Sequence, residues 1–152
     1  MIKKEVWDKK HKDSEGKYNK VTEFAKLCYF NFLKGKKGRL LELGCGKGAD
    51  AMFFYKHNLK VRAIDYSKEA IRQFNDIQQT LDIFIPTLVR DITENMPFEE
   101  DYFKFVYSRA TLYYFTDKEL KKIIKEVSRV LESEGLFMFQ VKSTSDKKYG
   151  KG

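Results

Sequence analysis

The sequence has few of the residues that build covalent or metal-centred scaffolds. Its 152 residues include two cysteines, two histidines, two prolines and one tryptophan. Cys28 and Cys45 are too few for a disulfide framework or a four-cysteine zinc site. His11 and His57 have no ligand partners at a spacing that a metal ion would use. We therefore expect no metal site and a reducing, cytoplasmic environment.

Long hydrophobic runs are also absent. No stretch approaches the roughly 18–20 apolar residues of a membrane span. Residues 1–8 lack the apolar core of a secretory signal, so we expect neither secretion nor membrane association. Hydrophobic residues still make up 42% of the chain and aromatic residues 15%, which is enough for one buried core and excludes a disordered chain.

The net charge of +8 is concentrated at the two ends of the chain, in residues 1–39 and 142–152, and the middle is slightly acidic. Basic ends attract polyanions, but they carry no pattern that reads a base sequence. We interpret them as a solvated lysine-rich surface, and we expect no specific nucleic-acid partner.

Strand and helix patterns alternate from residue 39 onward. Short apolar or alternating runs predict five strands, at residues 39–43, 60–64, 83–89, 103–108 and 136–141. Between them, helical spacing predicts a helix at 49–57, one capped by Ser67, and one capped by Asp117 that stops at Gly135. Pro86 suits an edge strand. We therefore expect a single α/β domain over residues 1–152, with a doubly wound, mainly parallel sheet.

A glycine-rich loop joins the first predicted strand to the next helix, with the sequence Glu42-Leu43-Gly44-Cys45-Gly46-Lys47-Gly48-Ala49. Such loops let backbone approach a ligand closely, at the sheet edge where nucleotides bind. Asp65 ends the next strand, where a carboxylate can accept both ribose hydroxyls or merely cap a helix. The loop also fits a relaxed dinucleotide fingerprint. Glu42 argues against that reading, because it would repel a pyrophosphate but suit a sulfonium ligand with a free amino group.

The loop resembles the first motif of class I S-adenosylmethionine (SAM)-dependent methyltransferases. Residues 61–67 and 89–92 are similar to the second and third motifs, and residues 103–115 and 131–137 resemble the segments around strands four and five. The resemblance covers residues 39–141. It implies a Rossmann-like sheet in the order 3-2-1-4-5, with SAM as the cofactor.

The resemblance also implies a role for each matching residue. The methionine part of SAM would lie against Glu42, Gly44, Cys45 and Gly46, with Ser108 beside it. Asp65 would bind the ribose and Tyr66 would cover the adenine, while Asp91 and Ile92 would meet the adenine amino group. The resemblance identifies no catalytic residue.

Three further residues are candidates for a lid or for the substrate side of the site. Trp7 lies in a Trp-Asp segment similar to one that covers the cofactor in many small-molecule methyltransferases; otherwise it anchors the first helix. Tyr113 begins an aromatic run that forms either core or a substrate platform, and Arg109 precedes it. The segment 108–111 lacks the Asn/Asp-Pro-Pro-aromatic motif of enzymes that methylate amino groups of nucleic-acid bases. This favours a small-molecule acceptor.

Two alternative functions stay open: a SAM-binding partner or regulator without turnover, and a fragment of a nucleotide-binding oxidoreductase. Only residues 142–152 follow the last predicted strand, so we expect five strands where this family normally has seven. The fifth strand would then be an open edge, which a homodimer could cover.

Overall fold

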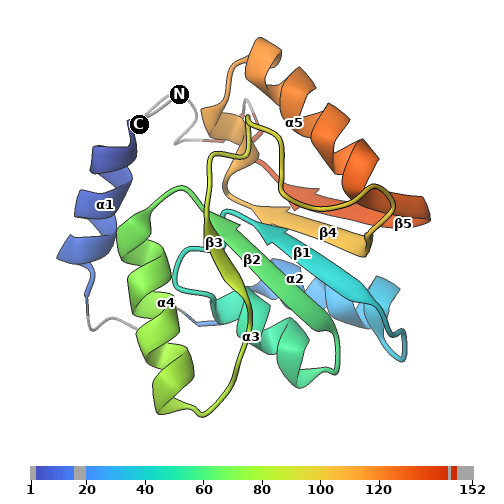
Figure 1. Cartoon of the computed structure of the whole chain (residues 1–152), viewed down its shortest axis with the longest axis horizontal. Helices are drawn as coiled ribbons and strands as arrows, with labels where there is room; N and C mark the ends of the chain where they lie inside the picture. Colours follow the sequence, from blue (N-terminus) through green and yellow to red (C-terminus); the bar gives the residue numbers. More distant parts are fainter. Residues whose placement is uncertain (1–2, 16–19, 144, 147–152) are drawn as a thin grey trace.

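The computed structural model describes residues 3–15, 20–143 and 145–146 (Figure 1). Its centre is a five-stranded parallel sheet in the order β3-β2-β1-β4-β5. The strands are β1 (Arg39–Leu43), β2 (Lys60–Asp65), β3 (Thr87–Val89), β4 (Phe103–Arg109) and β5 (Leu131–Gln140). The predicted fold class and strand order are therefore confirmed.

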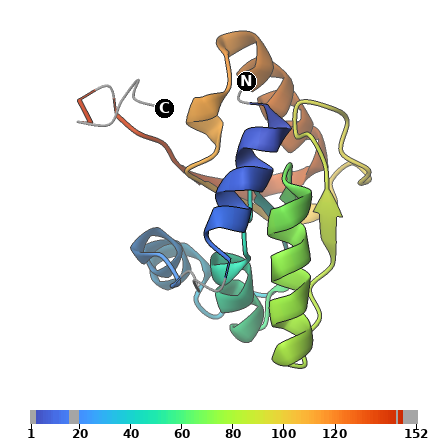
Figure 2. The ribbon, with the colours of Figure 1, turned by 90° about the vertical axis from the view of Figure 1, so that its left-hand side faces the viewer.

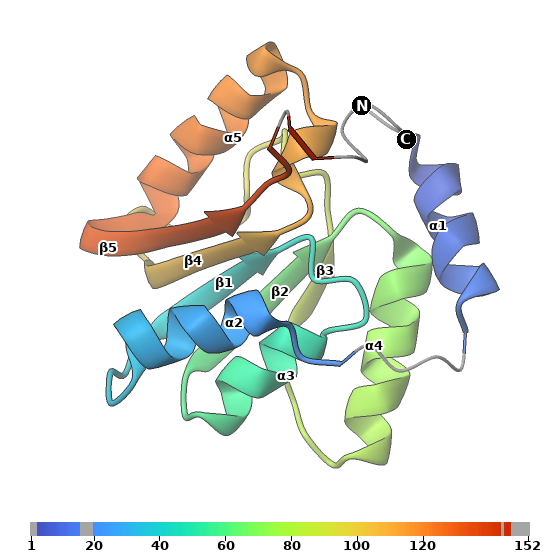
Figure 3. The same cartoon turned by 180° about the vertical axis from the view of Figure 1, so that it is seen from behind.

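Helices cover both faces of the sheet. One face carries α2 (Glu23–Cys28), which continues as the π-helix η1 (Tyr29–Leu33), together with α3 (Ala49–Lys56) and α4 (Lys68–Thr80) (Figure 3). The other face carries α5 (Asp117–Val130). Each layer has its own core, represented by Phe54 and Phe74 on the first face and by Val106 and Ile123 on the second. In the described ranges, no helix has the length and apolar character needed to cross a membrane.

The ends of α5 differ from the prediction. Its N-cap is Thr116, which forms a capping box with Glu119, and Asp117 lies in the first turn. The helix ends at Val130, and the left-handed residue after it is Glu134, with φ 62°. Gly135 was therefore wrongly predicted as the left-handed stop. It serves close packing instead, because a Cβ there would lie 2.7 Å from Cγ of Leu131.

The third strand is shorter than predicted. Only Thr87–Val89 pair with β2, and Pro86 lies just before them at the edge of the sheet. Just before this strand, the side chain of Gln78 makes the backbone hydrogen bonds that a neighbouring strand would otherwise make. Its Oε1 accepts from the backbone N–H of Ile85, and its Nε2 donates to the Ile85 carbonyl at 3.1 Å. The side chain of Gln78 therefore hydrogen-bonds to both backbone groups of Ile85, a residue that the sequence pattern had assigned to the third strand.

The N-terminal helix α1 (Lys4–Asp13) lies alongside α4 (Figures 1 and 2). Ser67 links the two helices. Its hydroxyl accepts from the Ala70 N–H at 3.1 Å, as an N-cap, and donates to Asp8 Oδ1 at 2.6 Å. Gln73 adds a hydrogen bond from its Nε2 to the His11 carbonyl at 3.0 Å. The contact is polar, and α1 has no fully buried residue.

Strand β5 forms one edge of the sheet, and no described segment pairs with its outer side. Phe139 and Val141 are about half exposed there. The homodimer through this edge stays a prediction.

The double role of Ser67 leads to a first prediction. We expect Ser67→Ala to lower the free energy of unfolding by about 0.5–2 kcal/mol, the usual cost of losing an N-cap, and to loosen α1. Thr116→Ala is the matched control, because it removes a cap of similar value from α5 without touching α1. Urea unfolding measures the stability, and the emission of Trp7, on α1, reports the docking of that helix. A spectrum that changes equally in both variants would contradict the link through Ser67.

Candidate functional site

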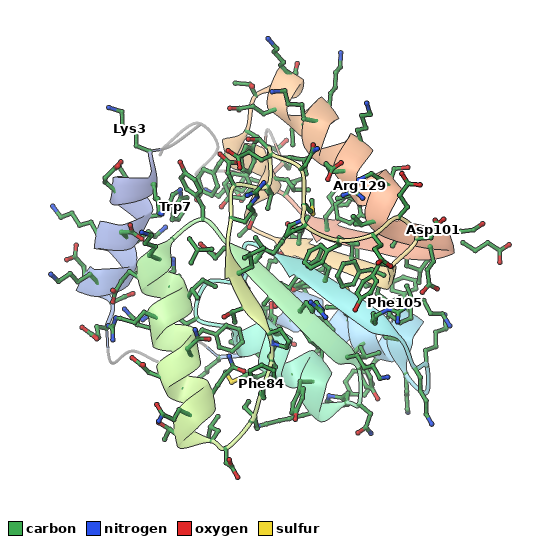
Figure 4. The ribbon with its side chains drawn as sticks, viewed as in Figure 1. Lys3, Trp7, Phe84, Asp101, Phe105 and Arg129 are labelled. Carbon is green, nitrogen blue, oxygen red and sulfur yellow. The ribbon has the colours of Figure 1, made fainter. Side chains whose placement is uncertain are left out.

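The carboxyl ends of the first four strands open into a cavity of about 570 Å³, within the range of about 300–1,000 Å³ typical of small-molecule sites. Helix α1 forms a further wall. Figure 4 shows Trp7 on the side of α1 that faces the sheet. The fold therefore places the cavity where open α/β sheets bind nucleotides.

Most of the residues proposed from the sequence line this cavity. They are Trp7, Glu42, Gly44, Cys45, Gly46, Asp65, Tyr66, Asp91, Ile92, Arg109 and Tyr113. Ser108 does not belong to the lining. It is fully buried opposite Leu43 in the β1–β4 pairing, and its hydroxyl donates to the Leu43 carbonyl at 3.1 Å.

Asp65 is held by backbone of the glycine loop and of α4. Its Oδ2 accepts from the Gly46 N–H at 2.7 Å, and its Oδ1 accepts from the Ser67 N–H at 2.8 Å. Burial raises the pKa of Asp65, against these hydrogen bonds and the nearby His11. Each oxygen has a second lone pair, so the carboxylate is fixed in place and still able to accept from a ligand.

Glu42 is almost completely buried, with 3% of its surface exposed, and its Oε2 has no hydrogen-bond partner among the described residues. Burial raises the pKa of Glu42 well above its ordinary value, and the carboxylates of Asp50 and Asp65 raise it further. A buried acceptor without a donor is costly in an empty site. A cationic ligand would supply what this oxygen lacks.

The third carboxylate, Asp50, was not proposed from the sequence. Its Oδ1 accepts from the Thr22 N–H at 2.8 Å, and its Oδ2 accepts from the hydroxyls of Thr22 and Tyr107, both at 2.8 Å. These partners come from the start of α2 and from β4. Because only the folded structure brings Asp50 and its partners together, no local sequence pattern predicts their contact.

Asp91 lies in the loop after β3. Its Oδ1 accepts from the backbone N–H and the hydroxyl of Thr93, at 2.8 and 2.7 Å. This turn points the carboxyl group at the cavity, beside the buried Ile92. Both residues line the cavity, and their role toward the adenine stays a prediction.

Helix α1 and the segment after β4 meet across the mouth of the cavity. The rings of Trp7 and Tyr114 pack edge to face, 4.9 Å between centroids. The side chain of Lys47, in the glycine loop, donates to the carbonyl of Ser14 just after α1. His11 also lines the cavity, and burial lowers its pKa against the opposing charge of Asp65. These contacts place α1 as a cover over the glycine loop.

Several lining residues were missed or left undecided by the sequence. The missed ones are Lys10, His11, Lys20, Thr22, Ala49, Asp50, Arg90, Ala110 and Thr111, and the undecided ones are Tyr114 and Phe115. Ala110 follows the Arg109 position with a left-handed φ of 54°. Because the residue in this turn is not a glycine, the sequence did not predict a left-handed turn here.

No cluster of three or more metal-binding side chains occurs in the described part of the chain. Cys45 is buried, and burial raises the pKa of its thiol, so it stays protonated. The site therefore consists of carboxylates, a glycine loop, a cationic rim and aromatic rings.

Comparison with protein families decides the relationship of this chain. Residues 40–135 match the model described as a methyltransferase domain. The chain belongs to this family. The class I SAM-dependent methyltransferase resemblance is confirmed, and with it SAM as the cofactor.

Individual relatives agree with the family. The chain is 32% identical to a sarcosine/dimethylglycine N-methyltransferase of Halorhodospira halochloris over 69% of its own length and 38% of that protein. Among solved structures, the PH0226 protein of Pyrococcus horikoshii is 28% identical, with a TM-score of 0.72 over 77% of this chain and 55% of that one. A putative SAM-dependent methyltransferase of Methanococcus maripaludis shares the fold at 21% identity, with a TM-score of 0.75 over 91% of this chain and 64% of that one. The chain spans 38–44% of the length of the curated relatives it matches.

The residues present fit this cofactor. The unpaired Oε2 of Glu42 suits an ammonium group, and the fixed carboxylate of Asp65 suits vicinal hydroxyls. Gly44, at φ 73°, leaves no room for a side chain, since a Cβ there would lie 2.0 Å from Oγ1 of Thr111. Backbone is therefore the only part of residue 44 that can face a ligand.

The raised pKa of Glu42 leads to a second prediction. A carboxyl group whose pKa is higher in the folded state lowers stability once pH exceeds its unfolded value, here 4.5. We expect Glu42→Gln to stabilise the ligand-free protein by about 1–3 kcal/mol near pH 8, and by less as pH falls toward 4.5. Urea unfolding across this pH range measures the difference.

Glu99→Gln is the control for the loss of one carboxylate, since Glu99 is exposed and does not line the cavity. If the stabilisation by Glu42→Gln stays constant with pH, or grows as pH falls, Glu42 does not have a raised pKa in the folded protein.

Proposed function

We propose that this chain is the cofactor-binding core of an enzyme that transfers the methyl group of SAM to a small-molecule acceptor. The observation that carries the proposal is the carboxylate end of the cavity, where Glu42, Asp50 and Asp65 converge around the glycine loop. Glu42 is the member that lacks a donor for one oxygen. An anionic dinucleotide would be repelled there, whereas a cofactor with an ammonium and a sulfonium group would be attracted.

Each part of the cavity has a role in holding the cofactor. Glu42 would receive the amino group, and backbone of Gly44 and Gly46 would support the methionine chain. Asp65 would accept from the ribose hydroxyls, held in position by its bonds to Gly46 and Ser67. The third-strand loop, with Asp91 and Ile92, would receive the adenine.

When bound, the cofactor would supply a methyl group that its positively charged sulfur activates for direct transfer. The chain itself therefore needs to orient the two reactants and exclude water, and a dedicated base is optional. Trp7 and Tyr114 both line the cavity and cover part of it by their ring contact, which suits water exclusion. Tyr113 and Phe115 add apolar surface on the same side.

The small-molecule acceptor is supported by two observations. The segment after β4 lacks the motif of enzymes that methylate nucleic-acid amino groups, and the cavity is partly covered by α1. The relative from Halorhodospira halochloris is named for sarcosine and dimethylglycine. Glycine, sarcosine and dimethylglycine therefore belong in a first acceptor panel.

Calorimetry tests the proposed cofactor. We expect SAM and S-adenosylhomocysteine to bind and NAD⁺ not to bind. We also expect Asp65→Asn to weaken SAM by about 1.5–3 kcal/mol, the contribution of a hydrogen bond to a charged group. Asp101→Asn is the control, because Asp101 is exposed and does not line the cavity. Binding of NAD⁺ without SAM would overturn the proposal.

The fluorescence of Trp7 tests independently whether α1 covers the bound cofactor, because Trp7 is the only tryptophan of the chain. We expect its emission to shift when S-adenosylhomocysteine binds, since its ring lies at the cavity against Tyr114. Tyr114→Leu should reduce the shift while binding persists. An unchanged spectrum at saturating ligand would leave Trp7 as a structural anchor only.

A further inference from the structure

Charge is divided between the two sides of the cavity. The lining carboxylates are Glu42, Asp50, Asp65 and Asp91, which come from β1, the start of α3, the end of β2 and the loop after β3, respectively. A second wall is built by lining residues of α1, Lys20 and residues 109–115, and none of these is acidic. It carries Lys10, Lys20 and Arg109 instead. The cavity therefore has a cationic side and a mainly anionic side, which also includes Arg90, the neighbour of Asp91.

The cationic side is also the aromatic side. Nζ of Lys10 lies 4.6 Å from the centroid of the Trp7 ring, and Nζ of Lys142 lies 4.8 Å from that of Tyr113. The hydroxyl of Tyr113 donates to that of Tyr114 at 3.0 Å, and burial raises the pKa of Tyr113, so this wall carries no phenolate charge. A ligand on this side meets flat apolar rings with ammonium groups at their faces.

Arg109 is the cation best placed to fix a ligand group. It lies at the carboxyl end of β4, where the chain leaves the sheet for the aromatic segment. Its charge lowers the pKa of Glu42, against burial and the neighbouring carboxylates, which raise it. Among the described residues, its hydrogen bond is the one from Nε to Oε1 of Gln140, at 3.2 Å, which leaves both terminal nitrogens available.

Local backbone holds Arg109 in this position. The next residue, Ala110, has a left-handed φ of 54°, a conformation that is unfavourable for a residue other than glycine. Its N–H donates to the Gln140 carbonyl at 3.1 Å, so Gln140 holds both the turn and the Arg109 side chain. Strain maintained in this way is typical of functional sites.

We propose that the acceptor carries a carboxylate beside an apolar or aromatic body, and that Arg109 anchors this carboxylate. The two free nitrogens of the guanidinium form a planar fork that matches a carboxylate, and Tyr113 and Tyr114 provide the surface for the body. The inference rests on the proposed function, because it names the acceptor class of the same site.

The test uses the protein saturated with S-adenosylhomocysteine and three acid–amide pairs as probes: benzoate and benzamide, phenylacetate and phenylacetamide, and 3-phenylpropionate and its amide. We expect at least one acid to bind about tenfold or more tightly than its amide, the effect of one charge-assisted hydrogen bond. Arg109→Gln should remove this preference, and Arg109→Lys should keep part of it. Lys121→Gln, an exposed position on α5, controls for the loss of one positive charge.

The outcomes separate the two proposals. Equal binding of acids and amides by the wild-type protein, including no measurable binding of either, would overturn the inference. So would tighter binding of phenyl phosphate than of benzoate, or an Arg109→Gln variant that loses S-adenosylhomocysteine but keeps the acid preference. If the wild-type protein binds neither SAM nor S-adenosylhomocysteine, the proposed function fails, and the inference falls with it.

Discussion

The convergence of three carboxyl groups on one glycine loop is the constraint on which the rest of the site depends. Asp50 and Asp65 are each held by hydrogen bonds from neighbouring backbone or hydroxyl groups, whereas Glu42 keeps one oxygen without a donor. Like charges this close are unfavourable in a buried site. The parallel sheet imposes the arrangement, because it brings the ends of β1 and β2 to the same edge. The site thus lowers the stability of the ligand-free protein, because it keeps an unpaired buried oxygen and neighbouring carboxyl groups together.

The fold followed from the sequence because its determinants are local. Period-two and period-3.6 patterns placed the strands and helices, and the glycine loop with Asp65 indicated the edge of the sheet that binds ligands. Errors arose where tertiary contacts outweigh local preference. Gln78 replaces a strand partner for Ile85, and packing against Leu131, rather than a left-handed turn, explains Gly135.

The site was predictable where one short segment carries both the geometry and the chemistry. Glu42, Gly44, Gly46 and Asp65 belong to such segments, and all line the cavity. Asp50 was missed because its setting depends on contacts between the start of α2, α3 and β4 that no sequence spacing encodes. Ser108 has the position along the chain that the resemblance implies, but its buried hydroxyl is used inside the sheet.

The docking of α1 is the feature with the widest consequence. This helix covers the cavity without burying any residue completely, and hydrogen bonds from Ser67 and Gln73 hold it to α4. Heat capacity changes on unfolding come mainly from apolar surface, so a polar contact of this kind contributes little to them. Undocking of α1 and melting of the core therefore respond differently to temperature. Cooling therefore weakens the apolar core and the Trp7–Tyr114 ring contact, but has less effect on the hydrogen bonds that join α1 to α4.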